Sequence, residues 1–292
     1  MTRLEEFGWR GKVEPGIGRV VSAHGDYYHL VCNEAEGGIL ARKKKSAFTK
    51  MKTAAPDDMK GLKISEIRAS APIVPITGDF VRFRYNAQGD SMILETLPRF
   101  SHFERKDPTA KRTSQTLAVN FDTLFIMMSL NENFSTARID RYLTLAEDRG
   151  GGDVCVVVTK IDLREKGDEE FLADLAETVA GRAEILHISA LTGEGMERVR
   201  ELTSPGRTLA FIGSSGVGKS TLLNTLAGEE CAAVQEVQEW SGKGRHTTTS
   251  RELVMLPSGA MVIDTPGIRE IGFLGERDEI RLKGESTHRW RK

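Results

Sequence analysis

The sequence predicts two domains of different fold class: a small all-β, OB-like barrel and, after it, an α/β domain built on a mainly parallel sheet. Residues 17–97 consist of short strand-like segments separated by turn residues. From residue 117 onward, apolar strands alternate with amphipathic helices. With 292 residues, 39% of them hydrophobic, the chain is long enough to form two cores.

Five segments in the first domain have the composition of strands, and turn signals such as Gly25-Asp26 lie between them. They are IGRVVSA (17–23), YYHLVC (27–32), GGILA (37–41), DFVRFRY (79–85) and SMILETL (91–97). About five short strands in about 80 residues are typical of a small barrel, and an OB-like barrel is one candidate. We place this domain at residues 1–100 and expect the polar stretch 101–116 to be a linker.

In the second domain strands and helices alternate in a regular order. Strands are expected at 123–130, 154–160, 184–190, 208–213 and 260–264, and helices at 135–151, 168–181, 194–202 and 219–228. Ser135 is a suitable N-cap for the first helix, and Gly150 is a suitable end. Because the strands are continuously apolar, we expect a parallel sheet that is covered by helices on both faces.

Composition excludes several classes of protein. The formal net charge is −1, so any affinity for nucleic acid has to come from a local patch. The three cysteines are widely spaced, which fits neither a disulfide framework nor a zinc pattern and favours a reducing, cytoplasmic location. The N-terminus lacks the apolar segment of a signal peptide, and no apolar run approaches the ~20 residues of a membrane helix.

One local patch of positive charge lies between two strands of the barrel. Residues 42–52 contain six basic residues and no acidic one, namely Arg42, Lys43, Lys44, Lys45, Lys50 and Lys52. Such a run is either a solvated loop or a contact to the phosphate backbone of RNA, and the sequence favours neither reading.

The stretch GSSGVGKST matches the phosphate-binding loop G-x-x-x-x-G-K-[ST]. It comprises Gly213, Ser214, Ser215, Gly216, Val217, Gly218, Lys219, Ser220 and Thr221. An apolar strand precedes it and a helix follows it, and this context argues against a chance glycine-rich turn. The N–H groups of residues 214–219 are expected to surround the phosphates, with Lys219 at the β- and γ-phosphates, Ser220 on Mg²⁺ and Thr221 near the α-phosphate.

A second motif, Asp-Thr-Pro-Gly, follows about 45 residues later. Asp264 ends an apolar strand, where a carboxylate can hold Mg²⁺ through water, and the N–H of Gly267 can sense the γ-phosphate. Between the two motifs lies GKGRHTTTSRE, in which either Thr247 or Thr248 is expected to close over Mg²⁺ as the first switch.

The guanine-reading motif lies upstream of the phosphate loop, in VVVTKID. Asp162 follows an apolar strand, where its carboxylate can accept both N1–H and N2–H of guanine, and Lys160 can lie over the base. Thr159 replaces the usual asparagine and keeps one hydroxyl for a contact to the phosphate loop. Downstream, Ser189, Ala190 and Leu191 are placed to contact the guanine O6 through their backbone.

The order of the motifs is therefore guanine, phosphate, switches, which predicts a circularly permuted GTPase domain over residues 117–272. A generic ATPase or kinase is the competing reading of the phosphate loop. Asp162 argues against it, because a carboxylate cannot make the same pair with adenine.

With these motifs the chain resembles the ribosome small-subunit-dependent GTPase family of the RsgA or YjeQ type. The resemblance covers roughly residues 4–272 and includes LEEFGW, RIDRYLTLA, VVVTKIDL, GSSGVGKSTLLN, GKGRHTTTSREL and DTPGIRE. It implies an OB fold that binds ribosomal RNA and a GTPase that the small ribosomal subunit stimulates. The implied role is late maturation of that subunit, with release on hydrolysis.

Catalysis needs a group other than the usual glutamine. Ile268 follows the Asp-Thr-Pro-Gly motif, where many GTPases have a glutamine that positions water, and isoleucine cannot do this. In the resembling family a histidine of the first switch is the candidate, which falls on His246. The alternative is that His246 only contacts phosphate or RNA. Lys219 is the second residue to which we assign a catalytic role.

The family resemblance also implies a C-terminal helical domain with a zinc site, and here the sequence departs from the pattern. No cysteine follows Cys231, so we expect no zinc and a short basic tail at 273–292. That tail either lacks a function, which we favour, or contacts RNA. The expected cofactor is Mg²⁺ with GTP, and the expected partners are the small ribosomal subunit and its RNA. We expect a cytoplasmic monomer that has no membrane contact. The alternative function is a GTP-binding RNA-interaction protein with little turnover.

Overall fold

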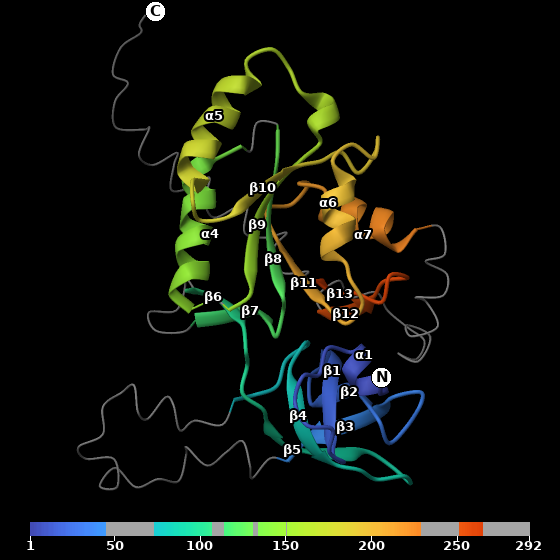
Figure 1. Cartoon of the computed structure of the whole chain (residues 1–292). Coiled ribbons are helices and arrows are strands. Elements are labelled where there is room, and N and C mark those ends of the chain that lie inside the picture. The colour runs from blue at the N-terminus through green and yellow to red at the C-terminus, as the bar shows by residue number, and fades with distance from the viewer. Residues whose placement is uncertain (45–72, 107–113, 131–133, 150, 229–250, 265–292) are drawn as a thin grey trace, which may run out of the picture.

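The structure is a computed structural model of the 292-residue chain, and it describes residues 1–44, 73–106, 114–130, 134–149, 151–228 and 251–264. The described residues form a small barrel and, beside it, a sheet with helices on both faces (Figure 1). Among them, no helix has both the length and the apolar character needed to cross a membrane.

The first domain is a closed barrel of five strands, as the sequence predicts. The strands are β1 (Ile17–His24), β2 (Tyr27–Cys32), β3 (Ile39–Lys43), β4 (Phe80–Arg84) and β5 (Ser91–Thr96), and a short helix, α1 (Arg3–Glu6), precedes them. Their order is β1-β2-β3-β5-β4, and β4 also pairs with β1, which closes the barrel. All pairings are antiparallel except β3 with β5, and this combination is that of an OB-like barrel.

Alternation along the barrel strands sorts the side chains into a core and a surface. Val20, Leu30, Val81, Phe83 and Ile93 are buried inside the barrel. At one end of the barrel Trp9 packs on Phe80, with ring centroids 5.0 Å apart. The segment after α1 is thereby fixed to the barrel.

The second domain contains the parallel sheet. Its elements are β8 (Thr123–Ser129), α4 (Thr136–Arg149), β9 (Asp153–Thr159), α5 (Asp168–Val179), β10 (Glu184–His187), α6 (Met196–Leu202), β11 (Thr208–Ile212), α7 (Lys219–Ala227), β12 (Glu252–Met255) and β13 (Met261–Asp264). The strand order is β10-β9-β8-β11-β13-β12, parallel throughout except for β12, which is antiparallel to β13.

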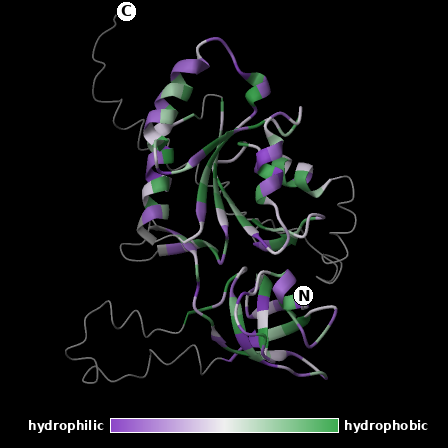
Figure 2. Cartoon of the chain, in the orientation of Figure 1, coloured by the Kyte–Doolittle hydropathy of each residue, from purple (hydrophilic) through white to green (hydrophobic). Residues whose placement is uncertain are grey.

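Helices cover both faces of this sheet, and successive residues of each strand face opposite sides. On one face Ile126, Val156 and Ile212 pack with residues of α4 and α5. On the other face Phe125 and Phe211 pack with residues of α6 and α7. Figure 2 shows mainly hydrophobic central strands between helices that mix hydrophobic and hydrophilic residues. Because both faces are covered, the strands are apolar along their whole length.

Three features of the fold differ from the simplest reading of the sequence. The stretch 101–116, expected to be a linker, contains β6 (His102–Lys106) and the start of β7 (Ser114–Val119), which pair antiparallel. Phe103 of β6 is fully buried and its ring meets Tyr142 of α4 edge-on at 6.3 Å, so this hairpin packs on the second domain. Strand β12 and helix α1 were also not anticipated.

Ser135 caps α4, since its Oγ lies 3.3 Å from the backbone N of Arg138, whereas Gly150 lies outside the described residues.

The two domains share one continuous sheet. Ser22 of β1 pairs with Glu252 of β12, so that the barrel strands and the parallel sheet form a single 11-stranded sheet. A hydrogen bond from Thr77 Oγ1 to the carbonyl of Arg251, at 2.9 Å, lies beside this pairing. The barrel is therefore attached to the edge of the sheet that β12 forms.

Candidate functional site

The phosphate-binding sequence forms the turn between β11 and α7. All five residues of β11 are buried, and Gly218 caps α7 at the end of the loop. Gly213 has φ +153°, and a Cβ built there would lie 2.4 Å from the carbonyl oxygen of Met127 in the neighbouring β8. No other residue fits this position, because the loop leaves the sheet in direct contact with a backbone carbonyl.

Lys219 folds back over this loop. Its Nζ lies 2.8 Å from the carbonyl oxygen of Gly213 and 2.7 Å from that of Ser214. Val217 is buried in the core beside α7, whereas Ser215 and Gly216 are exposed. Val217 thus anchors the loop in the core. The ammonium group of Lys219 lies where phosphate oxygens could replace the two carbonyl oxygens as hydrogen-bond acceptors.

The guanine motif begins at the end of β9, directly beside the phosphate loop. The Oγ1 of Thr159 lies 2.6 Å from the carbonyl oxygen of Val217 and 3.0 Å from that of Met128. The hydroxyl has one hydrogen and donates it to one of these acceptors at a time. Thr159 and Val217 are 58 residues apart in the chain, so this contact joins two motifs that the sequence separates.

The backbone turns sharply after Thr159. Lys160 has φ +60°, a left-handed conformation that costs a residue with a Cβ roughly 1–2 kcal/mol. A single turn of 3-10 helix, η2 (Ile161–Leu163), follows and presents Asp162 as an exposed side chain. A strained non-glycine residue of this kind is a feature of functional sites, and here it immediately precedes the turn that carries Asp162.

The second guanine segment is tied to the first and to α7. The backbone N–H of Ile161 donates to the carbonyl of Ile188 at 3.3 Å. Ser189 is fully buried, and its Oγ accepts from the N–H of Thr192 at 3.1 Å. Thr225 Oγ1 of α7 lies 3.3 Å from the carbonyl oxygen of Ala190. Leu191 is 82% exposed, so its side chain is open to a ligand or solvent.

Two of the residues expected to bind Mg²⁺, Ser220 and Asp264, lie at the same edge of the sheet. Ser220 is exposed in the first turn of α7. Strand β13 runs parallel to β11, with Ala210 opposite Ile263, and Asp264 ends β13. Serine and aspartate at these two positions are residue types that fit Mg²⁺ held together with phosphate oxygens. The described residues contain no group of three or more His, Cys, Asp or Glu side chains that could hold a metal ion by themselves.

Several predicted site residues cannot be placed. Outside the described residues lie His246, Thr247, Thr248, Gly267, Lys45, Lys50 and Lys52. Of the basic run, Arg42 and Lys43 end β3 and Lys44 follows it, exposed.

Arg42 has an aromatic neighbour that the sequence analysis missed. Its guanidinium lies over the ring of Tyr27, 4.3 Å from the centroid, and its Nε lies 2.6 Å from the Oδ2 of Asp90. Tyr27, Arg42 and Met92 are register partners on three neighbouring strands, and all three are exposed. The alternation of SMILETL could have marked Met92 as outward-facing, but the pairing that brings Tyr27 to Arg42 is not a local property.

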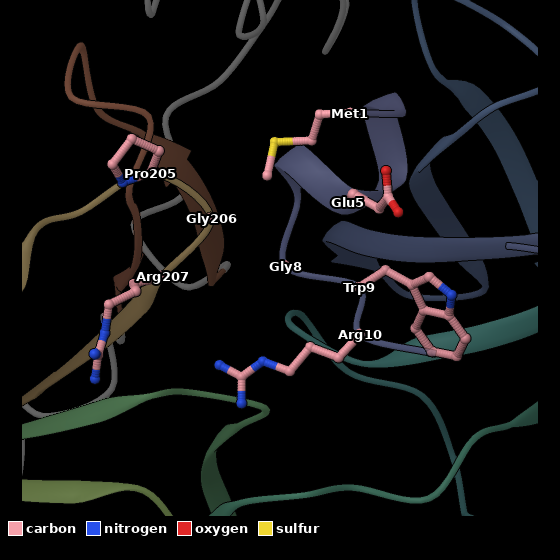
Figure 3. A pocket seen from close by; sticks show the side chains of 8 residues that line it. All are labelled: Met1, Glu5, Gly8, Trp9, Arg10, Pro205, Gly206 and Arg207. Carbon is pink, nitrogen blue, oxygen red and sulfur yellow. The ribbon is translucent and has the colours of Figure 1, made fainter. Parts of the chain in front are cut away.

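A cavity of about 530 Å³ lies at the junction of the two domains, away from these motifs. It is lined by Met1, Glu5, Gly8, Trp9, Arg10, Pro205, Gly206 and Arg207 (Figure 3). Residues 205–207 immediately precede β11, so the cavity lies at the opposite end of β11 from the phosphate loop.

Comparison with known proteins agrees with this arrangement. The sequence model of the RsgA GTPase family matches residues 96–274. The chain is similar to "Small ribosomal subunit biogenesis GTPase RsgA" of Leptospira interrogans, with 34% identity over 291 residues that cover 96% of this chain and 74% of the relative. It is 44% identical over 177 residues to "Small ribosomal subunit biogenesis GTPase RsgA 2" of Vibrio vulnificus, covering 60% of this chain and 49% of the relative.

Solved structures of similar fold include a YjeQ protein and a circularly permuted GTPase. The crystal structure of YjeQ from Thermotoga maritima superposes with a TM-score of 0.57 at 26% identity, covering 87% of this chain and 76% of that one. A circularly permuted GTPase, YloQ, superposes with a TM-score of 0.50 at 21% identity, covering 88% and 74%, and supports the fold alone. Permuted motif order, barrel and family match agree, and the chain belongs to the RsgA GTPase family.

Proposed function

We propose that this chain binds GTP and hydrolyses it as an assembly factor for the small ribosomal subunit. The observation that carries the nucleotide part is the 2.6 Å contact between Thr159 Oγ1 and the carbonyl of Val217. It brings the guanine motif and the phosphate loop together at one edge of the sheet. Open α/β sheets bind their ligands at this edge, outside the carboxyl ends of the strands.

Each motif then has one role. Asp162 pairs with guanine and Lys160 lies over the base, while residues 189–191 contact the guanine O6. Residues 213–221 hold the phosphates, with Lys219 at the β- and γ-phosphates. Ser220, Asp264 and a switch threonine, Thr247 or Thr248, would hold Mg²⁺ that binds with GTP, and the ion would neutralise phosphate charge.

Hydrolysis needs a group that orients the attacking water, and we assign this role to His246 because Ile268 cannot fill it. The N–H of Gly267 contacts the γ-phosphate.

The barrel supplies the contact to ribosomal RNA. Two of the most similar relatives bear the name "Small ribosomal subunit biogenesis GTPase", which supports the small subunit as partner. On the barrel, Tyr27 and Arg42 form an exposed ring and guanidinium pair of the kind on which RNA bases stack. The basic residues from Arg42 to Lys52 add phosphate contacts.

The remaining assignments follow from this function. The barrel is residues 1–100, the connection 101–116, the GTPase domain 117–272 and the tail 273–292. The protein acts in the cytoplasm as a monomer, during late maturation of the subunit, and hydrolysis releases it.

GTP hydrolysis by the purified chain, alone and with isolated small ribosomal subunits, tests the proposal. We expect slow turnover alone and strong stimulation by the subunits, with ATP as a poor substrate. Lys219→Ala supplies the background rate. Intact GTP binding with no stimulation would support the second candidate, a GTP-binding RNA-interaction protein with little turnover. Equal use of ATP and GTP would refute the guanine assignment.

A further inference from the structure

Arg19 of β1 is buried at the junction between the two domains. Its side chain is 1% exposed and lies over the ring of Phe80, 4.9 Å from the centroid. Burial lowers the pKa of Arg19 to about 9, so the guanidinium remains charged at neutral pH. A buried charge is stable only when polar groups surround it, and these groups therefore define what the residue does.

The hydrogen-bond partners of Arg19 come from both domains. Nη1 lies 2.6 Å from the carbonyl oxygen of Phe7, and Nε lies 3.4 Å from that of Gly78, on the barrel side. Toward the GTPase domain, Nη1 lies 2.9 Å from Thr208 Oγ1 and 3.4 Å from Met261 Sδ, while Nη2 lies 2.9 Å from the carbonyl oxygen of Asn120. One side chain thus connects the barrel to two strands of the GTPase sheet.

Those two strands are the ones that lead to the phosphates. Thr208 is the first residue of β11 and Met261 the first of β13, and the two residues are register partners. The carboxyl end of β11 leads into the phosphate loop, and Asp264 ends β13. A strand is nearly fully extended, with a rise of ~3.3 Å per residue, so a displacement at its start can be transmitted to its end, roughly 10–13 Å away in β13 and β11.

Polar contacts, rather than apolar packing alone, fix the start of β11. The N–H of Thr208 donates to Asp122 Oδ2 at 2.7 Å, and Asp122 also pairs with Arg10. The cavity shown in Figure 3 lies beside the residues that precede β11. Gly8 packs so closely here that a Cβ would lie 2.9 Å from Arg19 Nη1.

We propose that Arg19 is a positioning residue that makes the placement of the phosphate loop and of Asp264 depend on the placement of the barrel. As far as it concerns GTP, this inference rests on the proposed function. Linkage is reciprocal, so a ligand that displaces the barrel changes the affinity for GTP, and GTP changes the affinity of the barrel for its ligand.

The test compares Arg19→Met with Arg82→Met in the full chain. Arg82 is the control because its Nε lies 2.9 Å from Glu95 Oε1 within the barrel and its side chain is 42% exposed. Amide hydrogen exchange is measured along β11 and β13, together with the affinity for a non-hydrolysable GTP analogue. We expect Arg19→Met to speed exchange at residues 209–212 by about tenfold or more and to weaken the analogue by about fivefold or more, and we expect Arg82→Met to change neither.

Thr208→Val is a milder variant that removes only one partner of Arg19, and it keeps the test decisive if Arg19→Met does not fold. It should reproduce part of both effects, and combining it with Arg19→Met should add little, because the two residues share one interaction.

The inference would be overturned if amide exchange at β11 in Arg19→Met, or in Thr208→Val, were the same as in the wild type. Failure of the wild type to bind the GTP analogue would instead refute the proposed function, and exchange at β11 would still decide the role of Arg19.

Discussion

The hydroxyl of Thr159, at the end of β9, lies 2.6 Å from the backbone carbonyl of Val217 in the phosphate loop. Both groups are buried, so the carbonyl cannot exchange this partner for water. The position that normally carries an asparagine therefore still performs one of its tasks with a threonine. This relationship leads to the first prediction.

Thr159→Val should weaken GTP binding, because it keeps the shape of the side chain but leaves a buried carbonyl without its donor. A lost partner of this kind costs about 1–2 kcal/mol, which sets an upper bound of roughly 5- to 30-fold on the loss of affinity. Titration with a fluorescent GTP analogue measures the change. Thr159→Ser is the control and should bind almost as the wild type does. Equal affinity in the valine variant would show that the contact does not organise the site.

Lys219→Ala should abolish binding of nucleoside triphosphate. In the structure the ammonium group lies 2.8 and 2.7 Å from the carbonyl oxygens of Gly213 and Ser214, and phosphate oxygens compete for these hydrogen bonds. Calorimetric titration with GTP checks this loss, and circular dichroism of the variant verifies that it folds. Undiminished GTP affinity in a folded variant would show that the phosphate loop is not part of the nucleotide site.

Asp162→Asn should change the base that the protein prefers. The carboxylate accepts two hydrogens from guanine, whereas an amide can accept one and donate one, which matches xanthine. Losing a charged hydrogen bond costs about 1.5–3 kcal/mol, or roughly 10- to 100-fold in GTP affinity, and xanthosine triphosphate should recover most of it. Competition between GTP and xanthosine triphosphate measures the change in base preference. If the variant still favours GTP, Asp162 does not read the base.

His246→Ala should slow the turnover that small ribosomal subunits stimulate, by about 100-fold or more if the imidazole orients or deprotonates water. GTP affinity should stay unchanged, because the side chain acts on water rather than on the nucleotide. Single-turnover hydrolysis with saturating subunits separates the two effects. Wild-type rates in the variant would leave His246 with a contact role only.

Cys32 and Cys155 should resist alkylation at neutral pH. Both are buried, and burial raises the pKa of each thiol to about 11. A thiol with this pKa is only ~0.1% thiolate at pH 8, whereas an ordinary one, with pKa about 8.5, is roughly a quarter thiolate. Modification should therefore rise about tenfold per pH unit until near pH 11 and be rapid at pH 8 in denaturant. Peptide mapping by mass spectrometry after iodoacetamide treatment identifies the modified cysteines. Rapid labelling of either residue in the native protein at pH 8 would contradict the prediction.

Local sequence patterns were sufficient to predict most of the α/β domain. Strands such as 123–129 are apolar throughout and lie between helices with one apolar face, and this arrangement has few alternatives. The nucleotide motifs were also predictable as a group, because the carboxyl ends of parallel strands meet at one edge. Thr159 reaches Val217 for that reason, although the exact acceptor required the coordinates.

Other features depend on pairings that no local pattern contains. Barrel closure needs β3 beside β5 and β1 beside β4, and each pair is distant in sequence. Residues 101–116 of the hairpin β6–β7 are largely polar and resemble a linker, because its buried apolar residues, apart from Phe103, come later, at Leu117, Ala118 and Val119. Arg19 looks like a surface residue of an alternating strand. It is buried because acceptors from four separate segments, at Phe7, Gly78, Asn120 and Thr208, surround it.

The strand order also determines when the sheet can be completed during synthesis. In sequence, β12 and β13 are the last described strands, yet in the sheet they lie between β11 and the barrel strand β1. Domains fold as the chain emerges, N-terminal part first. Until the final strands arrive, one edge of β11 and the end of β1 that lies beyond its pairing with β4 are both unpaired, and a two-strand gap separates them. Docking of β12 and β13 closes that gap, so a nascent chain that stops before residue 252 has neither a finished GTPase sheet nor the shared strand pairing that holds the barrel to it.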